Sequence, residues 1–285
     1  MPQPTPDQKL PTGVSLWNGT KDQFLLRHDN RIVDLAQKFN SYGQGIDKIS
    51  IIKWLGQFEH KHLPIALKLL ETVDYYGPAR VLYEFKESYK QLVQLEGPDL
   101  SNKLFASFGY PGHSGDEMIY KFRLTNQLAD KRWNVNFLYL SDIGSYIDRN
   151  NLTFVFINDF VGSGKQAVET WENVQGFVSE KHAVYLIVMA AYQEGMKRIN
   201  EKTRLRVVAN RTLGDESKVF SERNPAFSLS EKTILSGYCQ RAGGVTQGYG
   251  GIQSLIIFHY RAPNNSIPIL WCNNRRWKGL FVRNP

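Results

Sequence analysis

Residues 154–166 read Phe-Val-Phe-Ile-Asn-Asp-Phe-Val-Gly-Ser-Gly-Lys-Gln, and this stretch decides the fold. Its first four residues, 154–157, are apolar and predict a buried strand. A loop of small residues, 162–164, follows, and from Lys165 onward apolar residues recur at the spacing of an amphipathic helix. A strand, a tight glycine loop and a helix in this order present several backbone N–H groups to one point, which suits a phosphate group.

Two kinds of nucleotide site use such a unit, and their residue spacing differs. A Walker phosphate loop requires the pattern G-x-x-x-x-G-K-[ST]. Here Asp159 stands at the first glycine position and Gln166 at the Mg²⁺-binding Ser/Thr position, so the Walker pattern fails twice. The stretch instead resembles the loop of type I phosphoribosyltransferases, in which four apolar residues and two acidic residues precede a Thr/Ser-Gly turn.

This resemblance implies a site for a ribose-5-phosphate unit, with carboxylates that hold the ribose hydroxyls and loop N–H groups that bind the 5′-phosphate. Asn158 replaces the first acid of the family pattern, so a binding site without turnover is an alternative to an enzyme. An ordinary glycine-rich turn between strand and helix is the plainer interpretation. The candidate residues are Asn158 and Asp159 for catalysis, and Gly162, Ser163, Gly164, Lys165 and Gln166 for phosphate and ribose binding.

Length and composition fit one large α/β domain with a smaller addition. The 285 residues are 42% hydrophobic, and 35 Lys and Arg against 27 Asp and Glu give a net charge of +8. That excess suits phosphorylated ligands or nucleic acid, and it is also ordinary for a soluble bacterial protein. Cys239 and Cys272 lack metal-ligand spacing, which predicts no metal site from protein spacing and a reducing, cytoplasmic location. The sequence contains no apolar run of about 18 residues, so no membrane span is expected.

The hydrophobic pattern divides the chain into a polar N-terminal arm (1–24), a helical cap (25–97) and an α/β domain (98–285). Alternating strands and helices in the last region predict a doubly wound parallel sheet. The cap also allows a helix-turn-helix interpretation, although it has no base-reading helix rich in Arg, Asn and Gln. Strands are expected at 104–109, 135–140, 152–158, 183–190, 205–209 and 254–259, and helices at 116–128, 193–202 and 228–241.

A second glycine loop, Gly112-His113-Ser114-Gly115, lies between the first strand expected in the α/β domain and its helix. Free N–H groups at the start of that helix would form a second anion site. In phosphoribosyltransferases a loop after an early strand binds the pyrophosphate, so the resemblance implies this role here, with Mg²⁺ accompanying the diphosphate ligand. A helix start that needs only a cap explains the same residues equally well.

Three later motifs stand out: Gly248-Tyr249-Gly250-Gly251, Pro263-Asn264-Asn265 before Ile267-Pro268-Ile269-Leu270-Trp271, and the terminal Trp277 with Leu280-Phe281-Val282-Arg283. Tyr249 is a candidate for stacking on a base, and Asn264 and Asn265 for a polar contact with a ligand or partner. Together with residues 154–164, these motifs are similar to the phosphoribosyltransferase-like domain of bacterial conflict systems, over about residues 104–283.

The resemblance implies an effector or toxin of anti-phage defence that acts on a nucleotide or ribosyl substrate. Members of this family occur beside retron reverse transcriptases, which implies a reverse transcriptase with its RNA–DNA product, and a winged-helix protein, as partners. A sensor of a phosphoribosyl ligand and a nucleic-acid-binding assembly subunit are the alternatives. Arg275, Arg276 and Lys278 favour contact with nucleic acid or a partner, although a solvated surface also explains them.

Overall fold

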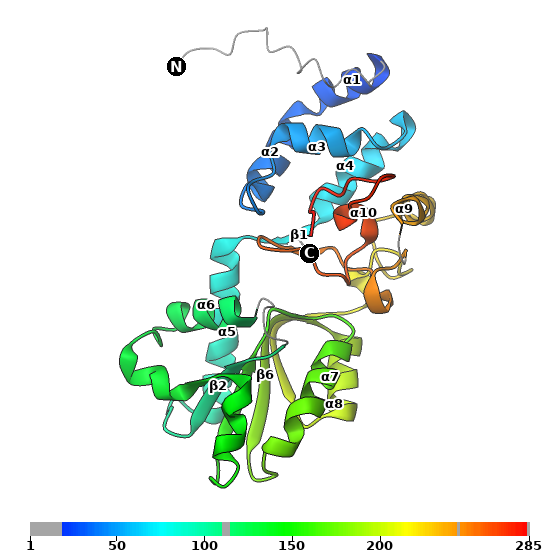
Figure 1. Cartoon of the computed structure of the whole chain (residues 1–285). Coiled ribbons are helices and arrows are strands. Elements are labelled where there is room, and N and C mark those ends of the chain that lie inside the picture. The colour runs from blue at the N-terminus through cyan, green and yellow to red at the C-terminus, as the bar shows by residue number, and fades with distance from the viewer. Residues whose placement is uncertain (1–18, 110–114, 244–245, 284–285) are drawn as a thin grey trace, which may run out of the picture. The chain divides into compact units, whose positions relative to one another are not determined.

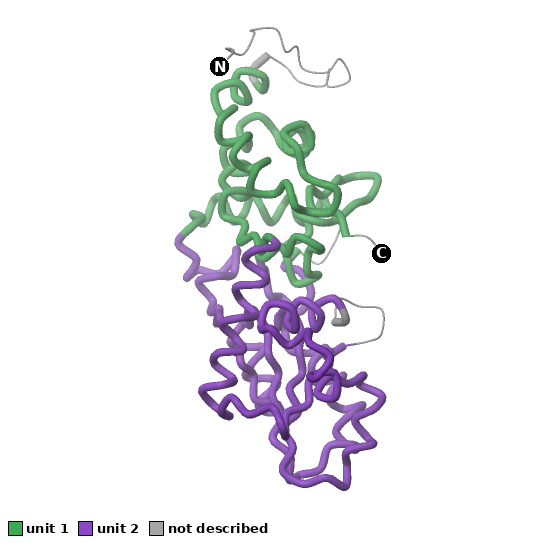
Figure 2. Tube along the Cα trace, turned by 90° about the vertical axis from the view of Figure 1, so that its left-hand side faces the viewer, with its two compact units in different colours: residues 1–77, 226–246, 255–285 green, residues 78–225, 247–254 purple. Residues whose placement is uncertain are grey.

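The computed structural model describes residues 19–109, 115–243 and 246–283. The chain forms two compact units, coloured separately in Figure 2. The helical unit contains residues 1–77, 226–246 and 255–285, and the sheet unit contains residues 78–225 and 247–254. These units divide the chain differently from the expected boundaries after residues 24 and 97, which stay a prediction.

The sheet unit is built on a six-stranded sheet in which every pairing is parallel. β4 and β5 pair with successive parts of β6, and β7 also pairs with β6. The predicted α/β class with a parallel sheet is therefore confirmed. The strands are β2 (Lys103–Ser107), β3 (Phe137–Leu138), β4 (Thr153–Ile157), β5 (Phe160–Val161), β6 (Ala183–Tyr192) and β7 (Arg206–Leu213).

Helices cover both faces of this sheet, α5 and α6 on one side and α7 and α8 on the other (Figure 1). Phe105 of β2 packs against Phe122 of α6, with ring centroids 5.6 Å apart. Phe156 of β4 and Trp171 of α7 belong instead to one buried cluster. Because successive strand side chains point to opposite faces, a sheet covered on both sides requires uninterrupted apolar strands such as β6. The helices are α5 (Pro78–Glu96), α6 (Gly115–Thr125), α7 (Lys165–Val174) and α8 (Gln193–Lys202).

The helical unit combines the N-terminal helices with the C-terminal segment. The indole N–H groups of Trp54 and Trp277 both donate to the carbonyl oxygen of Ile269, at 3.0 and 2.9 Å. Both tryptophans are buried, and their rings meet edge to face. The C-terminal residues therefore complete the core of the N-terminal helices. The helices are α1 (Gly19–Arg27), α2 (Asp29–Phe39), α3 (Lys48–Leu55), α4 (Leu63–Thr72), α9 (Leu229–Arg241) and α10 (Pro268–Trp271).

Two expected elements differ from the structure. The strand expected at 254–259 forms as β8 (Ile256–Phe258), but it pairs in parallel with β1 (Asp74–Tyr76) in a separate two-stranded sheet of the helical unit. A strand as short as β1 gives no period that a sequence pattern can detect. The strand expected at 135–140 shrinks to β3, because a 3₁₀ helix takes residues 131–136.

The remaining elements are short 3₁₀ helices: η1 (His60–His62), η2 (Lys131–Asn136), η3 (Leu140–Tyr146), η4 (Gln175–Phe177), η5 (Asp215–Ser217) and η6 (Tyr249–Gly251). In the part of the chain that the structure describes, no helix is both long enough and apolar enough to cross a membrane.

Candidate functional site

The strand, loop and helix expected from residues 154–166 form in the sheet unit. β4 ends at Ile157, and α7 begins at Lys165. Gly164 precedes the helix with φ of 72°, a left-handed conformation that glycine adopts without strain. The loop 162–164 therefore lies beyond the carboxyl end of a central parallel strand, which is where α/β sheets bind ligands.

Glycines bring this loop into direct contact with helix α8. A Cβ atom on Gly164 would lie 2.5 Å from the carbonyl oxygen of Gly195, and one on Gly195 would overlap the carbonyl of Gly162. Arg198, in the same helix, donates a hydrogen bond from Nη1 to the carbonyl oxygen of Ser163, at 2.8 Å. These contacts hold the loop in one conformation.

Gly195 and Arg198 were not expected to contribute to the site. A detectable signal did exist for Gly195, because a glycine inside a predicted helix costs about 1 kcal/mol relative to alanine and needs a reason. The reason is the close approach of the loop. Arg198 is one of several cations in its helix, and nothing in the sequence distinguishes it.

The segment Gly248–Gly251 also reaches the phosphate loop. Gly250 has φ of +69°, and a Cβ atom on it would lie 2.7 Å from the Cβ of Ser163. The ammonium of Lys165 lies 5.8 Å from the centroid of the Tyr249 ring. A hydrogen bond with Tyr249 is the main cause that raises the pKa of Lys165, and the nearby Glu169 carboxylate acts in the same direction. Tyr249 is 43% exposed, so part of its side chain is accessible to a ligand.

Asn158 and Asp159 occupy the gap between β4 and β5. The side-chain amide of Asn158 donates to the carbonyl oxygen of Phe108 at 2.7 Å, and its Oδ1 accepts from the backbone N–H of Asp159 at 2.8 Å. Asn158 therefore ties the ends of two neighbouring strands. Asp159 is 1% exposed, so a ribose reaches its carboxylate only if the groups that cover it move.

The second glycine loop is described only in part. Gly112, His113 and Ser114 lie outside the described residues, and Gly115 is the first residue of α6. Nε2 of Gln166 lies 3.5 Å from the place that a Cβ atom on Gly109 would occupy. The start of α7 therefore lies next to Gly109, in the segment that follows β2.

Asn264 and Asn265 belong to the helical unit, whereas Tyr249 belongs to the sheet unit. The backbone N–H of Ser266 donates to the carbonyl oxygen of Pro263 at 3.1 Å, which closes a turn over the two asparagines. Asn264 is exposed and Asn265 is buried. Of these two side chains, that of Asn264 is the one a ligand or partner could touch directly.

The donor set at the strand end bears on the expected Mg²⁺ ion. Within residues 19–109, 115–243 and 246–283, no group of three or more His, Cys, Asp or Glu side chains could hold a metal ion. Mg²⁺ takes six oxygen ligands, often one or two carboxylates together with waters and phosphate oxygens. Asp159 could supply one carboxylate, so the fit depends on a diphosphate ligand that supplies the other oxygens.

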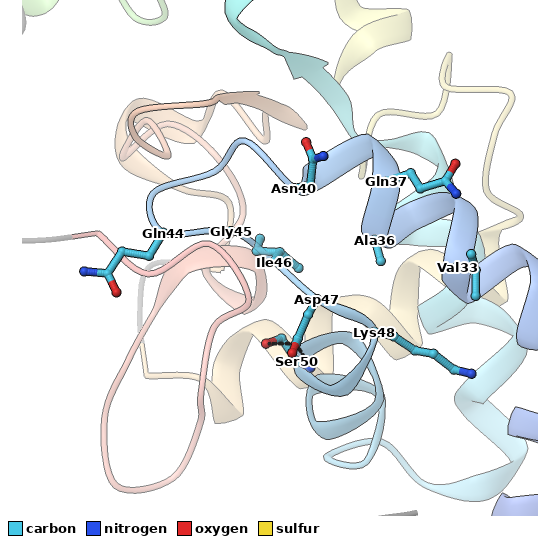
Figure 3. Close-up of a pocket in the computed structure, with 10 residues that line it drawn as sticks. All are labelled: Val33, Ala36, Gln37, Asn40, Gln44, Gly45, Ile46, Asp47, Lys48 and Ser50. Carbon is cyan, nitrogen blue, oxygen red and sulfur yellow. Dashed lines mark hydrogen bonds between the residues drawn. The ribbon is translucent and has the colours of Figure 1, made fainter. Parts of the chain in front are cut away.

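The helical unit has a hollow of its own (Figure 3). Its acidic residue, Asp47, accepts hydrogen bonds from the backbone N–H and the hydroxyl of Ser50, at 2.7 and 2.6 Å. These bonds lower the pKa of Asp47. Lys48 forms an ion pair with Asp29. Asp47 thus caps helix α3, and Lys48 pairs with a residue that does not line the hollow. The lining residues are Val33, Ala36, Gln37, Asn40, Gln44, Gly45, Ile46, Asp47, Lys48 and Ser50.

Comparisons with known proteins give one family match. A family model described as PRTase-CE matches residues 51–283. The comparison with curated proteins finds no match. The solved structures that match include the crystal structure of orotate phosphoribosyltransferase from Aeropyrum pernix, with 14% sequence identity and a TM-score of 0.30, over 45% of this chain and 70% of that chain.

Proposed function

This chain belongs to the PRTase-CE family, and from that membership we propose that its phosphoribosyltransferase-like site acts on a nucleotide or ribosyl phosphate. The proposed reaction is transfer or hydrolysis at the N-glycosidic bond. The observation that carries this proposal is the order of Asp159, the glycine loop 162–164 and the start of α7 beyond a central parallel strand. In the proposed site, the Asp159 carboxylate and the backbone donors at the start of α7 bind the two ends of one ribose phosphate.

The 5′-phosphate is proposed to bind at the start of α7. The first N–H groups of a helix have no partner within the helix, and Gly164 offers no side chain to cap them. An anion is stabilised there by the N–H groups and by the helix dipole. The ammonium of Lys165 adds a positive charge.

Asp159 is the proposed catalytic residue. A reaction at ribose C1′ develops positive charge on the sugar ring, and a carboxylate stabilises that charge. The amide of Asn158 is neutral, and it is already bonded to Phe108 and Asp159. Mg²⁺, when bound with a diphosphate ligand, would neutralise charge on the leaving pyrophosphate.

A sensor that binds a phosphoribosyl ligand without turnover is the second candidate. It is favoured by Asn158, which replaces the first acid of the family pattern and serves as a link between strands. A site that keeps its phosphate donors but has one carboxylate instead of two retains more binding than catalysis.

The biological role proposed from the resemblance is that of an anti-phage effector in the bacterial cytoplasm. A toxin must be restrained, so we propose a retron complex with a reverse transcriptase, its RNA–DNA product and a winged-helix protein. The family match supports the phosphoribosyltransferase-like part of this proposal. The defence role and the partners rest on the resemblance alone.

Two measurements test the proposed site. Calorimetry with 5-phosphoribosyl diphosphate, with and without Mg²⁺, reports binding by the purified full chain. Nucleotide and NAD pools, measured after expression of this protein alone, report turnover. Binding with depletion supports the enzyme, and binding without depletion supports the sensor. If neither binding nor depletion occurs, the proposed ligand class is wrong.

A further inference from the structure

The positive charge of this protein is concentrated in one of its two units. The helical unit contains 16 Lys and Arg against 9 Asp and Glu, a net charge of +7. The sheet unit, which carries the phosphate loop, contains 19 against 18, a net charge of +1. The excess therefore has little to do with the small-ligand site and requires its own explanation.

Within the helical unit, the C-terminal segment 255–285 contributes Arg261, Arg275, Arg276, Lys278 and Arg283 and no acidic residue. Three of these cations stand on one turn, which is closed by an antiparallel bridge between Asn273 and Lys278. Within the described parts of the chain, Arg275, Arg276 and Lys278 form no ion pair, and all three side chains are exposed.

The turn that presents these cations is firmly held. Trp277, between Arg276 and Lys278, is buried in the helical unit. Asn274 accepts hydrogen bonds from the backbone N–H groups of Arg276 and Trp277, and its amide donates to the carbonyl oxygen of Ala242. A rigid turn presents its charges without a further loss of backbone entropy on binding.

Hydrogen bonds connect this turn to another cation, Arg241, at the end of α9. The side chain of Gln57 bonds to both backbone polar groups of Lys278, at 2.7 and 2.8 Å. Arg241 donates to the carbonyl oxygen of the same Gln57 at 3.2 Å. Arg241 and Lys278 therefore flank one residue on the same surface.

The basic surface continues to η1. Glu59 forms an ion pair with Lys61 at 3.2 Å, and Lys61 and, more weakly, His62 and Arg241 lower the pKa of Glu59. Lys61 and Arg27 line one small hollow, together with His60. We call the exposed residues Arg27, Lys61, Arg241, Arg275, Arg276 and Lys278 the cationic surface. The acidic residue Glu59 lies beside these cations, since it pairs with Lys61 and is influenced by Arg241.

From this arrangement we infer that the cationic surface of the helical unit binds the phosphate backbone of a nucleic acid. Most of its cations are arginines, whose planar guanidinium groups bind phosphate oxygens in pairs. Protein–protein interfaces have an apolar core, and protein–nucleic acid interfaces are more polar and more positively charged. Phe24 and Pro64 line the small hollow, but none of the large hydrophobic side chains that are exposed in the described residues takes part in the contacts that connect the cations. Recognition is therefore of phosphates, independent of base sequence.

The test is fluorescence anisotropy of the full chain with a short labelled DNA duplex and an RNA–DNA duplex, over salt from ~50 to ~200 mM. The variant Arg275→Gln/Arg276→Gln removes two exposed cations from the surface. We expect its affinity to fall on the order of tenfold at the lowest salt, and the slope of log K against log salt to decrease in magnitude by about 2. The variant Arg27→Gln/Lys61→Gln removes two cations from the other end of the surface, and it should also decrease the magnitude of the slope of log K against log salt.

A matched control removes the same charge from the sheet unit. Lys131→Gln/Arg132→Gln changes two exposed, adjacent cations there and should leave affinity and slope as in the wild type. Circular dichroism verifies that each variant is folded. Equal weakening by this control would mean that net charge and not this surface drives binding. An unchanged slope in both surface variants would mean that these cations do not contact the phosphates, and it would overturn the inference. Sedimentation with phosphatidylserine vesicles separates the other anionic partner: vesicle binding without duplex binding overturns the inference.

Discussion

The side-chain amide of Asn158 donates a hydrogen bond to the backbone carbonyl of Phe108, at 2.7 Å. This bond joins the ends of β2 and β4. One predicted phosphate loop, 112–115, follows β2 in the chain, and the other, 162–164, follows β4. It also explains an asparagine at a position where the resemblance leads one to expect an acid, because a carboxylate has no proton to donate.

Asn158→Asp should therefore destabilise the protein and not restore an enzyme. The change places a carboxylate against the carbonyl oxygen of Phe108, and the loss of a part-buried hydrogen bond costs about 1–3 kcal/mol. Urea denaturation measures the free energy of unfolding. Asn150→Asp is the control, because Asn150 is exposed and uses only Oδ1, as an acceptor from Lys181, and it should change stability by less than about 0.5 kcal/mol. Equal stability of the two variants would remove the structural explanation for Asn158.

Asp159→Asn should abolish turnover or toxicity while the protein stays folded. The loss of one electrostatic contact with the transition state costs on the order of 3–4 kcal/mol, a few hundredfold in rate. The assay is depletion of nucleotide or NAD pools, with circular dichroism as the check on folding. Full activity in the folded variant would place the chemistry elsewhere and end the glycosyl-transfer proposal.

Gly195→Ala should displace the phosphate loop, since the added Cβ overlaps the carbonyl oxygen of Gly162. We expect a loss of stability of about 1–3 kcal/mol and a weaker affinity for 5-phosphoribosyl diphosphate. Gly237→Ala is the matched control: Gly237 lies inside α9, and its added Cβ would have no atom within 4 Å. That control should gain about 0.5–1 kcal/mol. Gly164→Val, at the loop itself, should prevent phosphate binding, because its Cβ would lie 2.5 Å from the carbonyl oxygen of Gly195 and displace the loop.

Tyr249→Ala should weaken binding of a nucleotide if the exposed ring stacks on the base. Base–aromatic stacking is worth about 1–3 kcal/mol by alanine substitution, so the dissociation constant rises accordingly. Tyr249→Phe keeps the ring and loses the hydroxyl, so it should retain most of the stacking while the pKa of Lys165 returns toward its ordinary value. Calorimetry with a nucleotide and with ribose 5-phosphate separates the two effects, because only the nucleotide has a base. Equal losses for both ligands would contradict stacking.

His182 should make stability fall on the acid side of neutrality. The ring is 3% exposed, and burial lowers its pKa from the ordinary value of 6.5, with Arg204 and Lys181 acting in the same direction. Below pH 6.5 the unfolded chain binds a proton that the folded chain resists. The contribution of neutral His182 to the free energy of unfolding is therefore complete above pH 6.5. It is lost as the pH falls toward the lower pKa of the folded state. Nδ1 accepts from the backbone N–H of Leu152 at 3.3 Å, a bond that a glutamine side chain can replace.

The measurement for His182 is the free energy of unfolding against pH, for the wild type and for His182→Gln. Other titrating groups are common to both proteins and cancel in the difference. The difference should change between pH 6.5 and more acidic values in favour of the glutamine variant. A difference that is constant with pH would show that His182 has the same pKa in the folded and unfolded states.

Local patterns in the sequence determined the strand–loop–helix unit at 154–166, the apolar strand β6 and the parallel α/β class. These depend on side-chain period and turn chemistry within about a dozen residues, so the chain carries them without reference to the rest of the fold. The site residues Asp159 and Gly162 to Gln166 stay predictions, although the structure places them on one strand end and one helix start.

Only the tertiary structure decided what meets this unit. Gly195 and Gly250 touch the phosphate loop, Asn158 holds Phe108, and Trp277 joins Trp54 on one carbonyl group. The partners in each of these contacts are far apart along the chain, and no period or turn signal connects such residues. They meet because the chain buries its apolar side chains in two separate cores, and burial depends on the whole chain, whereas a turn depends on a few neighbours.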